Sequence, residues 1–361
     1  MYNALRGQKV LSNLRKNSLR QCLLSDPYAI YYLCGRWIFP GERFLALIIK
    51  EDDKPVLVLN ELFRFEEEIG VRKVYYKDGQ ELTSLLGPLL NENEALGVDK
   101  NLPARYLLPL IDAKLASAFV NASWAVDDAR ALKDEEEREK MRRASLINDQ
   151  AMERFTKLVK EGITETEIAD QMLGIYKELG ANGYSFEPIV AFGKNAADPH
   201  HMPDDTKLKK GDVVLYDVGC VVDEYCSDMT RTFFFLEEPG EEARRIYELV
   251  RNANESAEAF CAPGRKIADI DKTARDIIAE GGYGKDFTHR LGHFIGMETH
   301  EAGDVSQANP NTAAAGNTFS IEPGIYSLEQ GVGVRIEDLV LITEDGVEVL
   351  NHYPHDIQII G

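Results

Sequence analysis

The sequence predicts a two-domain protein of mixed α/β (α+β) class, with one domain over residues 1–125 and the other over 126–361. Three observations lead to this prediction. The chain has 361 residues, more than the roughly 100–200 of one typical domain. Apolar runs typical of strands alternate with segments of helical periodicity. The charge also changes near residue 125: the first part holds 16 Lys and Arg against 15 Asp and Glu, and the second holds 25 against 46.

The first part of the chain combines predicted strands with a predicted helix. Apolar residues at 44–50 and 55–60 are typical of two strands, and the polar stretch 51–54 between them predicts a turn. Apolar residues recur at helical spacing over 104–115, which predicts a helix there. Residues 1–125 are therefore expected to form a small α/β domain.

Two helices are expected at the start of the second part. The polar stretch 134–143 opens a long helix, and its apolar face is predicted from residues at steps of three or four: Met141, Ala144, Ile147, Ala151, Phe155 and Leu158. Thr164 and Glu167 form a capping-box pattern, which marks the beginning of a second helix. The apolar face of this second helix is expected to hold Ile168, Met172, Ile175 and Leu179.

Strands and a second pair of helices complete the second part in a repeated order. Strand-like segments are found at 188–192, 212–219, 229–235, 317–326 and 333–342. Two further helices are expected at about 240–260 and 267–280. Two helices and a strand hairpin thus occur twice, although no repeat of the sequence itself is visible. This order suggests two pseudo-equivalent halves that enclose one site.

The charge and composition exclude several classes of partner. The net charge of −20 repels the phosphate backbone, so we expect no nucleic-acid partner. No apolar run reaches the roughly 20 residues of a membrane-spanning helix, and the N-terminus lacks the apolar core of a signal peptide. The sequence therefore predicts a cytoplasmic protein that does not bind membranes. A disulfide framework and a thiolate zinc site are not expected, because the cysteines are odd in number and scattered: Cys22, Cys34, Cys220, Cys226 and Cys261.

Five residues of the second part form a candidate metal-binding set. Asp217 and Asp228 lie eleven positions apart, and their carboxylates can meet if the strands at 212–219 and 229–235 pair as a hairpin. Taken alone, each aspartate would be interpreted as an ordinary surface or turn residue. Three more residues complete the set: His293, Glu322 and Glu337. The two glutamates have apolar or β-branched neighbours, where an unpaired carboxylate would be costly.

The chemistry of this set favours two divalent ions. Four carboxylates and one imidazole suit an ion such as Mn²⁺ better than they suit a thiolate zinc centre. Four negative charges also balance two divalent cations, whereas without metal they would repel one another. Two ions roughly 3.5–4 Å apart can activate a water molecule and polarise a carbonyl group.

Several motifs resemble a known family. In chain order they are DVG, SDMTRT, HRLGHFIG followed by HE, IEPGIY and GVRIED. Together they resemble the pita-bread metallopeptidases, namely aminopeptidase P, prolidase and methionine aminopeptidase, over roughly residues 130–350. The N-terminal part, including SDPYAIYYLCG, resembles the creatinase-type N-terminal domain of the proline-specific branch. The resemblance implies a creatinase-like α/β domain followed by a pita-bread catalytic domain.

The resemblance also implies an activity and a set of metal ligands. The activity is hydrolysis of the bond between an N-terminal residue and a following proline, so the expected partners are proline-containing peptides. Two divalent ions would be bound, with Mn²⁺ first and Co²⁺ or Zn²⁺ as alternatives, and we also expect a homodimer. Asp217, Asp228, His293, Glu322 and Glu337 would be the ligands, with Asp228 and Glu337 bridging both ions.

Other residues receive roles from the same resemblance. Glu322 would act as general base and later as general acid. His200 and His300 would stabilise the oxyanion or assist the departing proline nitrogen. His289 would line the substrate side, and Arg335 would orient the carboxylates. We interpret His201 as a neighbour of the site, and His352 and His355 as ordinary surface residues.

One departure from the family concerns substrate length. In prolidases an arginine after the His300 motif often captures the free carboxylate of a dipeptide. Here the stretch 301–321 contains no Arg or Lys, and Asp304 lies in the corresponding region. A dipeptide carboxylate would need another cation, such as Arg335 or one from a partner subunit. The sequence therefore favours an Xaa-Pro aminopeptidase that accepts longer peptides, with prolidase (Xaa-Pro dipeptidase) as the alternative.

Three further alternatives remain at this point. The first is a non-catalytic pita-bread module that binds peptides, although this chain keeps all five ligand positions. The second is a metal-independent amidinohydrolase of the creatinase type, which would not need the carboxylate cluster. The third is a hydrolase of non-peptide amides, because the same two-metal site would serve any amide that fits. Metal analysis of the purified protein separates the first two from the peptidase.

Overall fold

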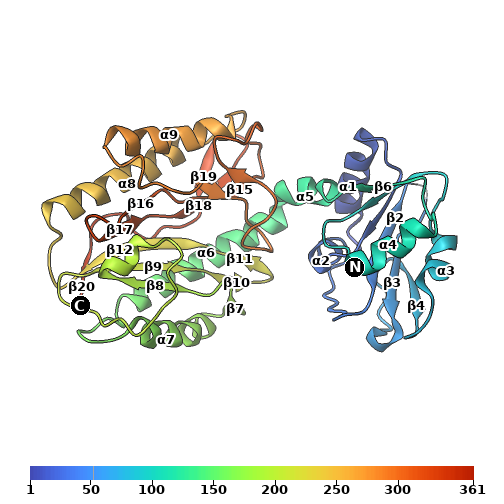
Figure 1. The fold of residues 1–361 in the computed structure, drawn as a ribbon, viewed down its shortest axis with the longest axis horizontal. Helices are drawn as coiled ribbons and strands as arrows, with labels where there is room; N and C mark the ends of the chain where they lie inside the picture. Colours follow the sequence, from blue (N-terminus) through green and yellow to red (C-terminus); the bar gives the residue numbers. More distant parts are fainter. Residues whose placement is uncertain (52) are drawn as a thin grey trace. The chain divides into compact units, whose positions relative to one another are not determined.

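The computed structural model describes residues 1–51 and 53–361 (Figure 1). The chain divides into two compact units, Met1–Arg130 and Ala131–Gly361. Both units combine helices with β-sheet, which confirms the predicted mixed α/β class. The predicted turn at 51–54 includes Asp52, which lies outside the described residues. Within the described ranges no helix is both long enough and apolar enough to cross a membrane.

The N-terminal unit is built on a six-stranded sheet in the order β4-β3-β2-β1-β5-β6. These strands are β1 (Gln21–Leu24), β2 (Leu45–Lys50), β3 (Val56–Asn60), β4 (Arg72–Tyr76), β5 (Ala95–Val98) and β6 (Ala118–Asn121). The predicted strands at 44–50 and 55–60 are β2 and β3, which pair antiparallel and are almost wholly buried. The helices are α1 (Ala4–Lys16), α2 (Pro27–Cys34), α3 (Leu82–Leu86), α4 (Ala104–Asp112) and α5 (Trp124–Ala131). The predicted helix at 104–115 is therefore present as α4.

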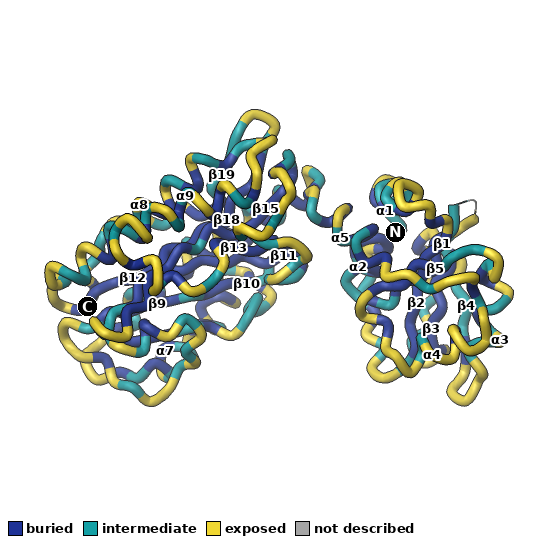
Figure 2. The backbone as a smooth tube through the Cα atoms, turned by 45° about the horizontal axis from the view of Figure 1, so that its top comes forward, coloured by how far each residue is buried: buried dark blue, intermediate teal, exposed yellow. Residues whose placement is uncertain are grey.

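Two helix pairs of the C-terminal unit cover its strands. The pairs are α6 (Glu135–Phe155) with α7 (Glu165–Glu178), and α8 (Glu241–Phe260) with α9 (Ile267–Glu280). The predicted capping box of Thr164 and Glu167 is present at the start of α7. Figure 1 shows α7 and the α8–α9 pair on opposite sides of the central strands. Figure 2 shows those strands as mostly buried, while the outer faces of the helices are exposed.

The hairpin predicted to bring two aspartates together is present. Four strands pair in the order β20-β12-β9-β8, and they are β8 (Ile189–Phe192), β9 (Val213–Val218), β12 (Met229–Phe235) and β20 (Ile359–Ile360). Strands β9 and β12 run antiparallel, with Thr230 opposite Asp217. A smaller sheet holds β7 (Gly183–Tyr184), β10 (Cys220–Val222) and β11 (Tyr225–Cys226).

The two long strands predicted at 317–326 and 333–342 are each interrupted. The first is divided into β15 (Thr318–Ile321) and β16 (Gly324–Ser327), and the second into β17 (Val332–Arg335) and β18 (Asp338–Ile342). Strand β15 pairs with β18, and β16 pairs with β17, in two separate sheets. Pro323 lies in the first gap, where it has no N–H group to continue a strand ladder. Three short strands complete the unit: β13 (Gly292–His293), β14 (Asp304–Val305) and β19 (Val347–Val349).

Candidate active site

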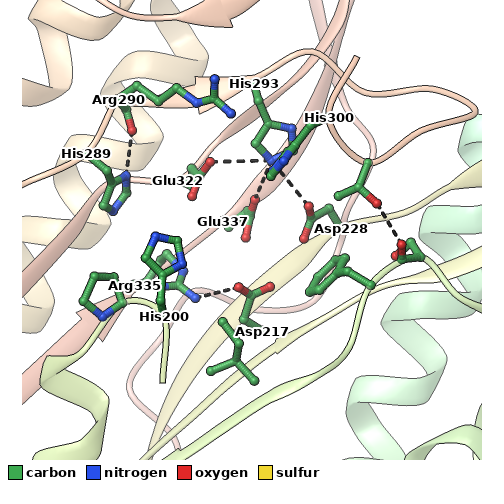
Figure 3. A pocket seen from close by; sticks show the side chains of 15 residues that line it. His200, Asp217, Asp228, His289, Arg290, His293, His300, Glu322, Arg335 and Glu337 are labelled. Carbon is green, nitrogen blue, oxygen red and sulfur yellow. Dashed lines mark hydrogen bonds and ion pairs between the residues drawn. The ribbon is translucent and has the colours of Figure 1, made fainter. Parts of the chain in front are cut away.

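A cavity of about 490 Å³ in the C-terminal unit gathers the predicted site residues (Figure 3). The cavity is lined by all nine predicted residues, which are His200, Asp217, Asp228, His289, His293, His300, Glu322, Arg335 and Glu337, and also by Arg290, which was not predicted. They come from stretches of the chain as far apart as residues 200 and 337. The fold therefore brings together residues that the sequence places in separate motifs.

The carboxylates lie where strands begin, end or are interrupted. Asp217 is on β9, and Asp228 directly precedes β12. Glu322 lies in the gap between β15 and β16, and Glu337 lies in the gap between β17 and β18. A single bridge between Glu337 and Thr230 joins the second gap to β12. The interruptions thus free both glutamates from regular pairing while they keep the side chains beside the β9–β12 hairpin.

His293 stands among three of these carboxylates. Its Nε2 atom lies 3.5 Å from Asp228 Oδ2, 3.6 Å from Glu322 Oε1 and 4.0 Å from Glu337 Oε1. Asp228, His293 and Glu337 each offer a ligand atom within 4.8 Å of the others, and all three are buried. This spacing exceeds that of a normal hydrogen bond, but one ion could contact several of these atoms.

Burial and mutual repulsion disfavour the ionised form of these carboxylates when no cation is bound. Burial, followed by the charge of Asp217, raises the pKa of Asp228 well above its usual range. Burial and the charge of Asp228 do the same to the pKa of Glu337. The pKa of Glu322 is raised to about 7, mainly by burial. A divalent cation would remove this penalty, because it favours the ionised form of each group.

Two unpartnered oxygens show that the residues fit a metal. Asp217 Oδ1 and Asp228 Oδ1 are buried and have no hydrogen-bond partner among the described residues. A buried carboxylate oxygen without a partner is costly. Hard oxygen donors with one imidazole nitrogen are a suitable ligand set for divalent ions such as Mn²⁺. The five residues that could hold two such ions are Asp217, Asp228, His293, Glu322 and Glu337.

Arg335 supports two of the carboxylates. Its side chain is 3% exposed, and its Nη2 atom donates to Asp217 Oδ2 at 2.6 Å. Its Nε atom donates at 3.0 Å to Thr230 Oγ1, which in turn donates to Glu337 Oε2 at 2.7 Å. Its Nη1 atom donates to the hydroxyl of Tyr326 at 2.8 Å. All three nitrogens of the guanidinium are therefore engaged in holding the site.

The imidazoles around the cavity differ in environment. The rings of His293 and His300 meet edge to face, with centroids 4.3 Å apart. Burial is the main cause that lowers the pKa of His289 and of His300 to about 4, so both rings are neutral at pH 7. His289 Nε2 lies 2.9 Å from the hydroxyl of Tyr326, whereas His200 is exposed. The single N–H of neutral His289 is directed to the backbone carbonyl of Arg290, 2.7 Å from its Nδ1, whereas the neutral ring of His300 can donate an N–H group to a substrate oxygen.

Comparison with known sequences identifies the family to which the chain belongs. The chain matches metallopeptidase family M24 over residues 139–344 and the creatinase/prolidase N-terminal domain over residues 6–132. The chain belongs to metallopeptidase family M24. Within the family, an uncharacterized peptidase of Staphylococcus aureus is 38% identical over 354 residues, which are 96% of this M24 chain and 98% of the relative. The resemblance seen in the sequence is thereby confirmed.

Two solved structures are similar to the whole M24 chain. Dipeptidase PepE from Mycobacterium ulcerans is 31% identical with a TM-score of 0.93, and the match covers 99% of this chain and 97% of that one. Prolidase from Pyrococcus furiosus is 32% identical with a TM-score of 0.84, and the match covers 95% of this chain and 99% of that one. Both likenesses extend over the N-terminal unit as well as the metallopeptidase unit.

Two histidines outside the cavity of the M24 chain have structural partners. His201 Nε2 lies 2.6 Å from Glu165, a fully buried carboxylate at the start of α7. Glu165 also accepts hydrogen bonds from the backbone of Phe192 and Asp204, so it fastens the loop that carries His200. The prediction that His355 is an ordinary surface residue is wrong. Its Nε2 atom lies 2.8 Å from the buried Asp338, because the C-terminal segment folds back against β18.

Sequence reasoning missed three residues of the M24 site. Arg290 and Tyr326 lie inside motifs that were recognised, HRLGHFIG and IEPGIY, but neither was assigned a role. Glu165 lies between Thr164 and Glu167, the two residues of the predicted capping box, and was not itself singled out. Its contacts with residues 192–204 depend on the fold, so no local pattern could reveal them.

Proposed function

We propose that this M24 metallopeptidase hydrolyses the peptide bond between an N-terminal residue and a following proline, with two divalent ions as cofactors. The observation that carries the proposal is the meeting of four carboxylates and His293 in one cavity, with an unpartnered oxygen on both Asp217 and Asp228. The names of the two similar structures, a dipeptidase and a prolidase, support the same class of reaction.

The chain's own residues have distinct roles in this reaction. Bound divalent ions supply Lewis acidity, which polarises the scissile carbonyl and lowers the pKa of a water molecule. Glu322 takes up the proton of the attacking water and returns it to the departing nitrogen. Its side chain is 17% exposed, against 2% for Glu337, so it can exchange a proton with the cavity. His300 and His200 donate N–H groups to the oxyanion as it develops.

We propose Xaa-Pro dipeptides as the preferred substrate length, in place of the longer peptides that the sequence favoured. The expectation of longer peptides depended on the lack of Lys and Arg in residues 301–321. A different cation, Arg290, lines the cavity. It can serve a short substrate that ends in a free carboxylate.

The test is a cleavage panel on protein dialysed against a chelator and then reloaded with Mn²⁺, Co²⁺ or Zn²⁺. We expect Ala-Pro to be cleaved faster than Ala-Pro-Ala, Ala-Ala to resist cleavage, and all activity to need metal. As a matched pair, Asp228→Asn is expected to abolish activity and Asp223→Asn to retain it, because Asp223 is an exposed partner of Arg143 on the β10–β11 turn. Full activity in metal-free protein would overturn the proposal.

A further inference from the structure

Arg290 is a cation on the cavity wall whose guanidinium is free to bind a ligand. It follows His289 in the chain, lines the cavity and is exposed. Among the residues that the structure describes, no acidic side chain lies within 4.0 Å of its guanidinium, and no hydrogen bond holds that group. Figure 3 shows its side chain on the same side of the cavity as His293 and Glu322.

The second arginine of the cavity is not available in this way. Arg335 donates to Asp217, Thr230 and Tyr326, and its side chain is 3% exposed. A move towards a substrate anion would strain or break these hydrogen bonds, including the one to Asp217, a candidate metal ligand. Of the cavity-lining residues that the structure describes, Arg290 and Arg335 are the two that carry a fixed positive charge. Arg290 is therefore the better candidate to bind an anion.

Asp304 does not neutralise Arg290. It lies opposite His293 in the β13–β14 pair, and Arg290 precedes the first residue of β13. Its Oδ1 atom accepts a hydrogen bond of 2.8 Å from Ser306 Oγ, which holds the carboxylate within its own loop. Two divalent ions would balance the four candidate ligand carboxylates, so these carboxylates would not serve as a counter-ion for Arg290.

We propose that Arg290 recognises a carboxylate of the substrate through a two-pronged ion pair, an inference that rests on the proposed peptidase function. A planar guanidinium matches the geometry of a carboxylate and binds it through two parallel hydrogen bonds. A dipeptide offers such a group in two places, at its free C-terminus and on an acidic N-terminal side chain. The C-terminal carboxylate is present in every dipeptide, and residues 301–321 offer it no Lys or Arg.

The experiment compares substrates that differ in one charge. Activity is measured on Ala-Pro and Ala-Pro-amide, and on Glu-Pro-amide and Gln-Pro-amide, for the metal-loaded wild type, Arg290→Gln and Arg290→Lys. We expect Arg290→Gln to lower kcat/KM for Ala-Pro about ten- to a hundredfold through KM, and to leave the Ala-Pro-amide value and the metal content unchanged. Arg290→Lys should recover part of the loss. Lys285→Gln removes an exposed charge that precedes Arg290 in the chain and does not line the cavity, and it serves as the control.

Each outcome decides the inference. A loss confined to Ala-Pro identifies the C-terminal carboxylate, and a loss confined to Glu-Pro-amide identifies the acidic side chain. An equal loss on charged and neutral substrates, or no loss at all, overturns the proposal. If the wild type cleaves no Xaa-Pro bond, the proposed function fails. Carboxylate recognition is then decided by calorimetry, in which the wild type should bind proline more tightly than prolinamide and Arg290→Gln should bind both equally.

Discussion

The Arg335–Asp217 pair offers the most direct test of how the site is held together. The two side chains are 3% and 14% exposed and are joined by a hydrogen bond of 2.6 Å. Replacing Arg335 by Met leaves the Asp217 carboxylate buried without its cation, which typically costs about 3–5 kcal/mol of unfolding free energy. For the C-terminal unit this loss corresponds to a fall in Tm on the order of 10 °C. The fall should be smaller with metal, because a bound cation also compensates Asp217.

The assay is differential scanning calorimetry with and without metal. Calorimetry is preferred because both tryptophans, Trp37 and Trp124, lie in the N-terminal unit, so their fluorescence would not follow this transition. The matched control is Arg142→Met, which breaks a two-pronged pair with Glu348 whose side chains are 31% and 35% exposed. The unfolding free energy of that variant should fall by less than about 1 kcal/mol. Equal losses in Arg335→Met and Arg142→Met would refute the reasoning.

Four further predictions concern a candidate metal ligand, a cavity histidine, the anchor of the histidine loop and a buried carboxyl group. Asp228→Asn should lose metal content, measured by mass spectrometry, together with activity. His300→Ala should lose turnover at wild-type metal content, and lower metal content would contradict its assignment as a non-ligand. Glu165→Gln should lower kcat and cost about 1–3 kcal/mol of unfolding free energy without loss of metal. The reason is that an amide replaces the buried carboxylate that accepts hydrogen bonds from the loop carrying His200. An unchanged kcat would show that Glu165 does not position this loop for catalysis. Burial and the charge of Asp338 raise the pKa of Glu258 from 4.5 to about 9. The folded state therefore holds this proton more tightly than the unfolded state, and stability should fall as pH rises from about 4.5 towards 9. In Glu258→Gln the urea midpoint should change less between pH 6 and pH 9 than in the wild type, and equal changes would exclude this cause.

The sequence indicated much of the catalytic unit because its signals are local. The capping box at Thr164, the helix periodicity and the paired strands around Asp217 and Asp228 each depend on residues close together in the chain. The interruptions of the two long strands were missed, although Pro323 is a visible signal for the first. No such signal marks the second, where Glu337 bridges to Thr230 across 107 positions.

Contacts between distant residues account for the rest of what the sequence did not show. Arg335 was predicted to orient the carboxylates. That its guanidinium is already engaged follows from its contact with Asp217, 118 positions away, which no local pattern shows. The buried ion pair of Lys133 and Glu301 joins residues 168 positions apart, at 2.9 Å. The availability of Arg290 is likewise a property of the folded cavity, because it follows from what its neighbours already bind.

The buried cysteines allow the opening of each of the two units to be measured separately. All five thiols are free and buried, and burial raises the pKa of both Cys22 and Cys220 to about 12. A thiol in this state does not react with an alkylating reagent until its surroundings open. Cys22 and Cys34 lie in the N-terminal unit, and the other three lie in the C-terminal unit. The rate at which each thiol is alkylated, read by peptide mass spectrometry, therefore reports how often each unit opens, with no engineered label in the chain.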